Sequence, residues 1–187
     1  MIAYTTSNTK EDLLGILALQ KVNTPEALTN EQIKSQGFVT VRHSYDELKQ
    51  LNDIEKHIIA KDERRVVAYL LAMTDQSKFD FPILIPMFEV FNSLSFAGKT
   101  ISAYNYLVVG QVCVEAQYRG QGILDGCYAA YKHRFQGRYD FAITEIASTN
   151  VRSLNAHRRI GFKEIHRYTS PDKTEWSIVL WDWKKSN

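Results

Sequence analysis

The sequence predicts a mixed α/β (α+β) fold, with one central sheet of parallel and antiparallel strands and helices on both faces. Residues 106–146 are typical of a buried strand, a loop, a helix and a second strand, which is the pattern of a right-handed βαβ unit with parallel strands. Apolar alternation before and after this unit indicates further strands, which make the sheet mixed. At 187 residues the chain fits one domain, so we expect 1–187 to fold as a single domain.

In the first part of the chain, capping residues and apolar periodicity predict each element. Pro25 ends the first helix, Asn30 and Ser44 are N-cap residues for the next two, and Gly37 closes the second. The expected elements are, in order, a strand at 2–5, helices at 11–21 and 30–35, a strand at 38–42, a helix at 45–53, and paired strands at 54–60 and 66–73 around a turn at 61–64.

The second part of the chain carries stronger local signals, except at 74–100, where Pro82 and Pro86 interrupt an apolar stretch. That stretch either shapes an acceptor-binding side or forms a core hairpin. Asn150 is the predicted N-cap of the last helix, and Gly161 its C-cap. The remaining elements are a strand at 106–114, a loop at 115–122, a helix at 123–135, a strand at 141–146, a helix at 151–160, and strands at 162–168 and 175–183.

Composition and charge exclude several function classes. The chain has 23 basic and 21 acidic residues, and this balance predicts no strong field for nucleic acid or a membrane surface. Cys113 and Cys127 stand far apart and match no metal-ligand spacing, so we expect two buried thiols, no metal site and a reducing compartment. Because 1–10 lacks the pattern of a signal peptide, we expect a cytoplasmic protein.

The loop at 117–123, with the sequence QYRGQGI, has the features of a phosphate-binding site. Gly120 and Gly122 allow backbone N–H groups to converge, and the start of the next helix adds unpaired donors. Arg119 supplies a permanent positive charge. A dinucleotide motif does not fit, because Asp125 stands at its third glycine position, and we interpret Gly98-Lys99 as a hairpin turn rather than the end of a P-loop.

Two motifs together resemble the GNAT superfamily of acyl-CoA N-acyltransferases. The segment 117–122 matches the family pattern Q/R-x-x-G-x-G/A, and 150–162 resembles N-x-x-x-x-x-x-Y-x-x-x-G-F. The matched region covers roughly 106–168. The resemblance implies a GNAT-like fold in which a central mixed β-sheet is splayed between two parallel strands, here 106–114 and 141–146, and acetyl-CoA lies in the splay as co-substrate.

The resemblance also implies which residues contact the cofactor. Main-chain groups of the first parallel strand hold the pantetheine arm, main-chain N–H groups of the loop hold the pyrophosphate, and residues at the start of the last helix contact the cofactor arm. At the matching positions of this sequence these residues are Val112, Cys113 and Val114; Arg119, Gly120, Gln121, Gly122, Ile123 and Leu124; and Asn150 and Ser153.

Two residues are candidates for proton transfer. His157 stands where the family has a tyrosine that donates a proton to the leaving thiolate, and the alternative is that the imidazole only fills the space of that tyrosine. Glu145, at the end of a predicted strand, is the candidate general base, because some protein-acetylating members of the family carry a glutamate there. The alternative is a structural glutamate paired with a surface cation, and Glu89 is a weaker rival.

The predicted function is N-acetyl transfer from acetyl-CoA to an amine by direct attack in a ternary complex. The alternative is a catalytically silent acyl-CoA-binding or sensing module on the same fold. The acceptor is an amine-bearing small molecule or a protein or peptide amine, with no nucleic acid or membrane partner. Family members are often dimers, and Trp181 and Trp183 offer a face that either pairs two chains or packs within one.

Overall fold

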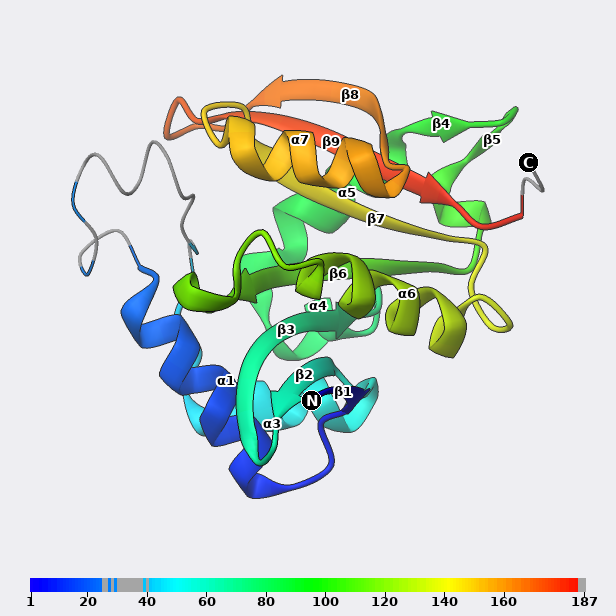
Figure 1. Ribbon diagram of the computed structural model, residues 1–187. Helices are drawn as coiled ribbons and strands as arrows, with labels where there is room; N and C mark the ends of the chain where they lie inside the picture. The colour runs from blue at the N-terminus through cyan, green and yellow to red at the C-terminus, as the bar shows by residue number, and fades with distance from the viewer. Residues whose placement is uncertain (25–26, 28, 30–38, 40, 185–187) are drawn as a thin grey trace. The chain divides into compact units, whose positions relative to one another are not determined.

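The computed structural model describes residues 1–24, 27, 29, 39 and 41–184, and Figure 1 shows its elements. The strands are β1 (Ile2–Thr6), β2 (Ile58–Asp62), β3 (Arg65–Met73), β4 (Ser95–Phe96), β5 (Lys99–Thr100), β6 (Tyr106–Val114), β7 (Phe141–Ala147), β8 (Lys163–Thr169) and β9 (Glu175–Asp182). The α-helices are α1 (Lys10–Val22), α3 (Tyr45–Ile54), α4 (Ser77–Asp80), α5 (Ile85–Ser93), α6 (Ile123–Phe135) and α7 (Val151–Ile160). Short 3-10 turns are η2 (Pro82–Leu84), η3 (Ile101–Ala103) and η4 (Ala116–Tyr118).

Seven strands form one mixed sheet in the order β1-β2-β3-β6-β7-β9-β8, and β4 and β5 form a separate hairpin. The parallel pair is β6 with β7, as the βαβ pattern predicted. The chain divides into two compact units, one comprising 1–72 and 109–134 and the other 73–108 and 135–187.

In the first unit, helices cover both faces of β1–β3. Tyr4 pairs with Ala60 and points toward α6, because a side chain added at Gly126 would meet the Tyr4 ring. The alternate residues Ile59 and Tyr69 point the other way and join a buried apolar cluster with residues of α1 and α3. Both of these helices begin at a side-chain cap of the expected kind, with Ser44 capping α3 as predicted.

In the second unit, β7 and β9 also carry helices on both faces (Figure 1). On one face the Phe141 ring stacks on the Tyr106 ring, whose hydroxyl donates to Asn92 of α5 at 2.8 Å. On the other face the Trp181 ring lies against Phe162, at the end of α7. Since side chains alternate along a strand, odd-numbered residues of β7 point toward the α5 side and even-numbered residues toward α7.

The elements predicted for 106–182 are confirmed to within one residue at almost every boundary. The predicted strand at 54–60 is wrong at its start, because α3 continues through Ile54 and β2 begins at Ile58. The predicted helix at 30–35 with Gly37 lies outside the described residues. So do Phe38 and Thr40 of the predicted strand 38–42, whose described members are not in strand conformation.

The stretch at 74–100 forms the short helices α4, η2 and α5, followed by the β4–β5 hairpin at 95–100. Pro82 opens η2, and Pro86 stands in the first turn of α5. Proline is favoured at these positions, since the first N–H groups of a helix have no acceptor within it. The predicted turn at Gly98-Lys99 is confirmed, because it joins β4 to β5.

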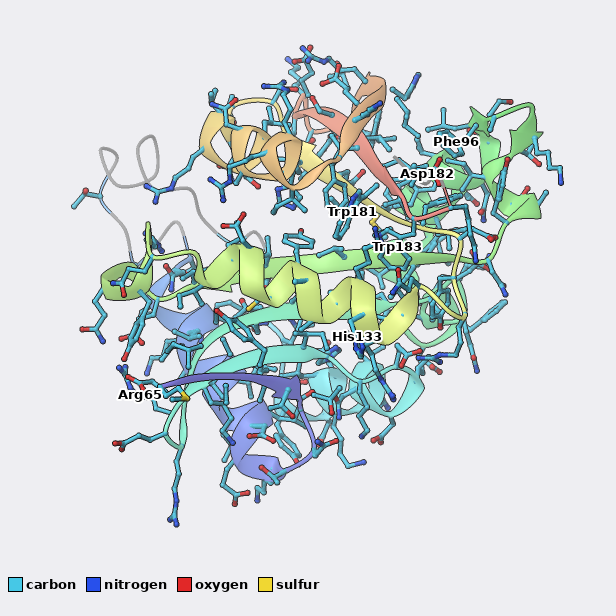
Figure 2. All side chains as sticks on the ribbon, turned by 45° about the vertical axis from the view of Figure 1, so that its right-hand side comes forward. Arg65, Phe96, His133, Trp181, Asp182 and Trp183 are labelled. Atoms are coloured by element: carbon cyan, nitrogen blue, oxygen red, sulfur yellow. The ribbon has the colours of Figure 1, made fainter. Side chains whose placement is uncertain are left out.

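Among the described residues, no helix combines the length and the apolar character needed to cross a bilayer. Figure 2 shows Trp181 and Trp183 near the end of β9, and their ring centroids are 5.8 Å apart. Trp183 is 7% exposed, so this face of β9 packs within the chain, which was one of the two alternatives for the pair.

Candidate acyl-CoA site

Two glycines shape the backbone of the loop between β6 and α6. Gly120 and Gly122 both have φ of +77°, in the left-handed region that glycine favours. A Cβ added at either glycine would meet nothing within 4 Å, so the space beside the backbone is open. We call the segment 119–124 the cradle.

Two groups at the start of the cradle are engaged within the protein. The Arg119 N–H donates to the Ala116 carbonyl at 3.2 Å, which closes η4. The Arg119 side chain donates from Nε to the Val114 carbonyl at 2.8 Å and from Nη2 to Asn23 Oδ1 at 2.7 Å. This guanidinium therefore anchors the loop to the end of α1. The donors that we propose for the pyrophosphate are accordingly those from Gly120 to Leu124.

The strand leading into the cradle alternates between exposure and burial. Val112 and Val114 are half-buried, whereas Cys113 is 6% exposed and belongs to the apolar cluster beneath α1 and α3. Burial raises the pKa of the Cys113 thiol to about 12, and that of Cys127 likewise to about 12. The prediction of two buried thiols is confirmed. Only the main chain of Cys113 is left as a candidate ligand, because its thiol points into the core.

In the second unit, α7 starts at the predicted cap. Asn150 Oδ1 accepts from the Ser153 N–H at 3.2 Å, and the helix ends at Gly161 with φ of +120°. A Cβ at Gly161 would lie 2.9 Å from Nε1 of Trp181, so this position also requires the close approach that glycine permits. The side-chain NH2 of Asn150 takes no part in the cap and remains a donor for a ligand.

His157 is buried, being 2% exposed, and its ring packs edge-on against Phe162 with centroids 5.1 Å apart. Nδ1 lies 2.8 Å from the Ser153 carbonyl oxygen. A carbonyl can only accept, so Nδ1 carries the proton and Nε2 of the neutral ring has the lone pair. Burial lowers the pKa of His157 to about 4, against a weaker opposing effect of the Ser153 carbonyl. The resting imidazole is therefore neutral at pH 7.

Glu145 lies on the opposite face of the second unit's sheet from His157. As an odd-numbered residue of β7 it points toward the α5 side, while His157 belongs to α7, which covers the other face. Its Oε2 accepts from the Tyr168 hydroxyl at 2.7 Å. Burial raises the pKa of Glu145, and the hydrogen bond from Tyr168 partly opposes this. The hydrogen-bond partner of Glu145 is thus a neutral hydroxyl group and not the surface cation of the alternative interpretation. Glu89, the weaker rival, lies exposed on α5.

Solved structures of low sequence identity match this chain over nearly its whole length. A NatC complex bound to Gag peptide and CoA matches with a TM-score of 0.65 at 15% identity, over 98% of this chain and 99% of that one. The ribosomal-protein-S18-alanine N-acetyltransferase from Escherichia coli matches with a TM-score of 0.64 at 11% identity, over 100% and 97%. A protein of the GNAT family from Desulfovibrio desulfuricans matches with a TM-score of 0.63 at 10% identity, over 97% and 99%.

The chain has the GNAT fold. At these identities the likeness shows the fold alone, and the activity is argued separately below. No family model matches the sequence, and no curated protein matches it. Of the two motifs that suggested the GNAT fold, the first ends at the start of α6 and the second runs along α7.

Tyr168 is the site residue that sequence reasoning missed. It lies on β8, 23 positions from Glu145, and the two are brought together only by the order β7-β9-β8. In that order Ala147 pairs with Trp176 and Trp176 with Tyr168, so Tyr168 shares a face with Glu145, two residues before Ala147. The contact between Glu145 and Tyr168 could have been predicted only by assigning the strand register of β7, β9 and β8 in the GNAT fold.

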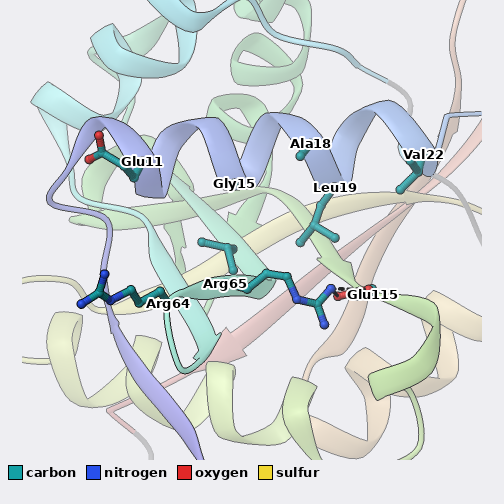
Figure 3. A pocket seen from close by; sticks show the side chains of 9 residues that line it. Glu11, Gly15, Ala18, Leu19, Val22, Arg64, Arg65 and Glu115 are labelled. Carbon is teal, nitrogen blue, oxygen red and sulfur yellow. Dashed lines mark hydrogen bonds and ion pairs between the residues drawn. The ribbon is translucent and has the colours of Figure 1, made fainter.

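A cavity of about 390 Å³ lies elsewhere in the first unit, between α1 and the turn from β2 to β3 (Figure 3). Its lining includes Gly15, Ala18 and Val66, with Arg65 and Glu115 at one side. None of the residues predicted to bind the cofactor lines it. The cavity is therefore separate from the cofactor site that the sequence predicts at the cradle.

We expect Gly122→Val to raise the Kd of acetyl-CoA at least tenfold, which is about 1.4 kcal/mol or more. A branched side chain would occupy the open space beside the cradle and is strained at a φ of +77°. Gly98→Val is the matched control, because Gly98 has a φ of +84° and an equally open surround in the β4–β5 hairpin. Calorimetric titration checks both, and equal Kd values for folded Gly122→Val and wild type would refute the assignment of the cradle.

Proposed function

We propose that the protein is an N-acetyltransferase that moves an acetyl group from acetyl-CoA to the amine of an acceptor. The observation that carries the proposal is the cradle, where two left-handed glycines with open space beside them lead directly into the first turn of α6. The start of a helix adds a favourable dipole for a pyrophosphate. The GNAT fold supports the same choice of ligand, because CoA is bound in the NatC structure that this chain resembles.

The chemistry proposed here requires no protein nucleophile. A neutral amine attacks the thioester carbon, the C–N bond forms and the C–S bond breaks. The nitrogen loses one proton as it becomes an amide, and this balances the proton that the thiolate takes up. The protein has to hold the cofactor, orient the amine and remove the proton of the incoming ammonium. For the last step we propose Glu145, acting directly or through water, since burial raises its pKa toward the range useful for a base.

We propose His157 as the group that returns a proton to the thiolate. The resting ring is neutral, so it cannot donate from Nε2 until it is protonated. A thiolate forming within a few ångströms would favour the imidazolium and raise the pKa of His157 at that moment. The alternative is that solvent protonates the thiolate and His157 only packs against Phe162.

We expect His157→Phe to lower kcat at least tenfold and to change the Kd of acetyl-CoA little. The phenyl ring keeps the packing against Phe162 but carries no proton. His157→Tyr is the control that restores a donor and should retain more activity than the phenylalanine variant. Steady-state rates and calorimetry on the three proteins check this, and equal kcat for wild type and His157→Phe would remove His157 from the mechanism.

A second candidate function is an acyl-CoA-binding module without catalysis. The observation that favours it is the neutral, buried imidazole at the position where the family has its acid. Both candidates bind acetyl-CoA, so binding does not separate them. Release of free thiol does, measured with a panel of small amines, peptides with a free α-amino group and peptides with a lysine side chain. Thiol release with an acetylated product, identified by mass spectrometry, supports the enzyme; cofactor binding with no release from any amine supports the module.

A further inference from the structure

We infer that the turn between β2 and β3 belongs to the cofactor-binding apparatus, with Asp62 and Arg65 as positioning residues that hold the cradle in its binding conformation. The inference rests on the proposed role of the cradle. None of the groups involved was among the predicted site residues. All of them lie in the first unit, within 62–65 and 115–118.

A continuous set of side-chain contacts joins the turn to the segment before the cradle. Arg65 Nη1 lies 2.7 Å from both carboxylate oxygens of Glu115, and Figure 3 shows this side chain reaching across to Glu115. Arg65 Nη2 donates to the Tyr118 hydroxyl at 3.1 Å, and that hydroxyl donates to Asp62 Oδ2 at 2.8 Å. The guanidinium carbon of Arg65 also lies 5.5 Å from the centre of the Tyr118 ring. One arginine thus contacts both ends of the segment.

The contacted segment leads directly into the cradle. Glu115 precedes the 3-10 turn η4 and Tyr118 is its last residue, and the Tyr118 N–H donates to the Glu115 carbonyl at 2.9 Å. The Glu115 N–H in turn donates to the Val67 carbonyl of β3 at 2.9 Å. The next residue but one after Tyr118 is Gly120, the first left-handed position. Fixing Tyr118 therefore limits the conformations that Gly120 can adopt.

The cradle is consequently held from two directions. Arg119 ties it to the end of α1 through Asn23, and Tyr118 ties it to the β2–β3 turn. Glycine loses more conformational freedom on ordering than any other residue, so a loop with two glycines orders at an entropic cost. If that cost is met on folding, cofactor binding does not have to meet it, and affinity rises.

The exposure of these groups argues against a role in overall stability. The side chains of Arg65 and Glu115 are 54% and 22% exposed, and ion pairs of this kind contribute about 0–1 kcal/mol to folding. The second unit contains a comparable pair, in which Arg167 contacts Glu164 at 2.9 Å with exposures of 47% and 36%. Arg167 lies on β8, outside the cradle-bearing unit, and is a matched control for loss of an exposed arginine pair.

The test uses Tyr118→Phe, Arg65→Met, Arg65→Lys and Arg167→Met in the full chain, with CoA as the probe. We expect Tyr118→Phe and Arg65→Met to raise the Kd of CoA roughly five- to twentyfold while their melting temperatures match that of Arg167→Met. Arg65→Lys should recover part of the affinity, and Arg167→Met should bind CoA as the wild type does. Without ligand, amide hydrogen exchange at 120–124 should be faster in Arg65→Met than in Arg167→Met.

The steady-state rates give a second readout. Acetyl-CoA KM should rise in Tyr118→Phe and Arg65→Met, whereas kcat at saturating acetyl-CoA should stay near the wild-type value, because the contacts order the loop and do not touch the reacting atoms. Wild-type CoA affinity in both variants, or equal exchange at 120–124 in Arg65→Met and Arg167→Met, would overturn the inference while leaving the proposed function intact. Failure of the wild-type protein to bind CoA would overturn both.

Discussion

Glu145→Gln should lower kcat/KM about a hundredfold or more at pH 7, which is the lower end of the usual contribution of a general base. The glutamine oxygen can still accept the Tyr168 hydroxyl, so the β7-β9-β8 arrangement should survive the change. What is lost is the ability to take a proton from the ammonium of the acceptor. In the wild type, the raised pKa of Glu145 places the acid limb of the pH–rate profile above the ordinary range of a glutamate, and activity falls as pH drops through it.

The pH dependence separates this role from a structural one. In Glu145→Gln the acid limb that the carboxyl group sets should disappear. The rate should then depend on the fraction of free amine in solution, which increases toward high pH. Glu164→Gln is the matched control, since it removes one carboxylate from β8, where Glu164 pairs with the exposed Arg167. A profile for Glu145→Gln that overlies that of Glu164→Gln across the pH range would exclude Glu145 as the base.

The second large effect concerns stability in acid. His57 is fully buried, and its Nδ1 accepts from the Ala72 N–H at 3.1 Å. Burial lowers the pKa of His57 to about 3 and that of His157 to about 4. An unfolded chain binds these protons near pH 6.5, so below that pH it is stabilised relative to the folded state. Stability is therefore complete above about pH 6.5 and is lost as pH falls toward 4.

Each of the two histidines should cost roughly 1.4 kcal/mol of unfolding free energy per pH unit in this window, or roughly 2–3 kcal/mol between pH 6.5 and 4.5. Urea unfolding at several pH values measures the slope. His57→Gln is the informative variant, because its amide oxygen can still accept the Ala72 N–H while no proton is taken up. The change in its unfolding free energy with pH should be smaller than that of the wild type by the contribution of one histidine, roughly 1.4 kcal/mol per pH unit. Equal slopes for the two proteins would contradict the assignment of a neutral, buried His57.

The half of the fold that carries the cofactor motifs could be predicted from sequence because its signals are local. Asn150 and Gly161 mark the two ends of α7, and the apolar run of β6 ends where the glycines begin. The segment 74–100 could not be predicted so well, because Pro82 and Pro86 suggest interruption although each stands in the first turn of a helix. Proline at a helix start and proline that breaks a helix look alike until the backbone around them is known.

In the candidate site, too, the features set by local sequence could be predicted and those set by tertiary contacts could not. The cradle was predictable because backbone donors at a strand-to-helix junction follow from glycine placement within a few residues. The partner of Glu145 was not, since Tyr168 reaches it across β9 by strand pairing alone. The neutral state of His157 was also hidden, because spacing places the ring on a helix face but does not give its burial or its bond to the Ser153 carbonyl.

A cradle built from main-chain N–H groups has a consequence for how far such sequences can diverge. Every residue except proline supplies the same N–H group, so between Gly120 and Leu124 the backbone geometry restricts residue choice mainly at the two left-handed glycines. Side chains elsewhere in the loop can be exchanged without loss of a donor. A loop of this kind therefore sets few limits on sequence, which is compatible with a shared fold at about a tenth identity between this chain and two of the solved structures that it resembles.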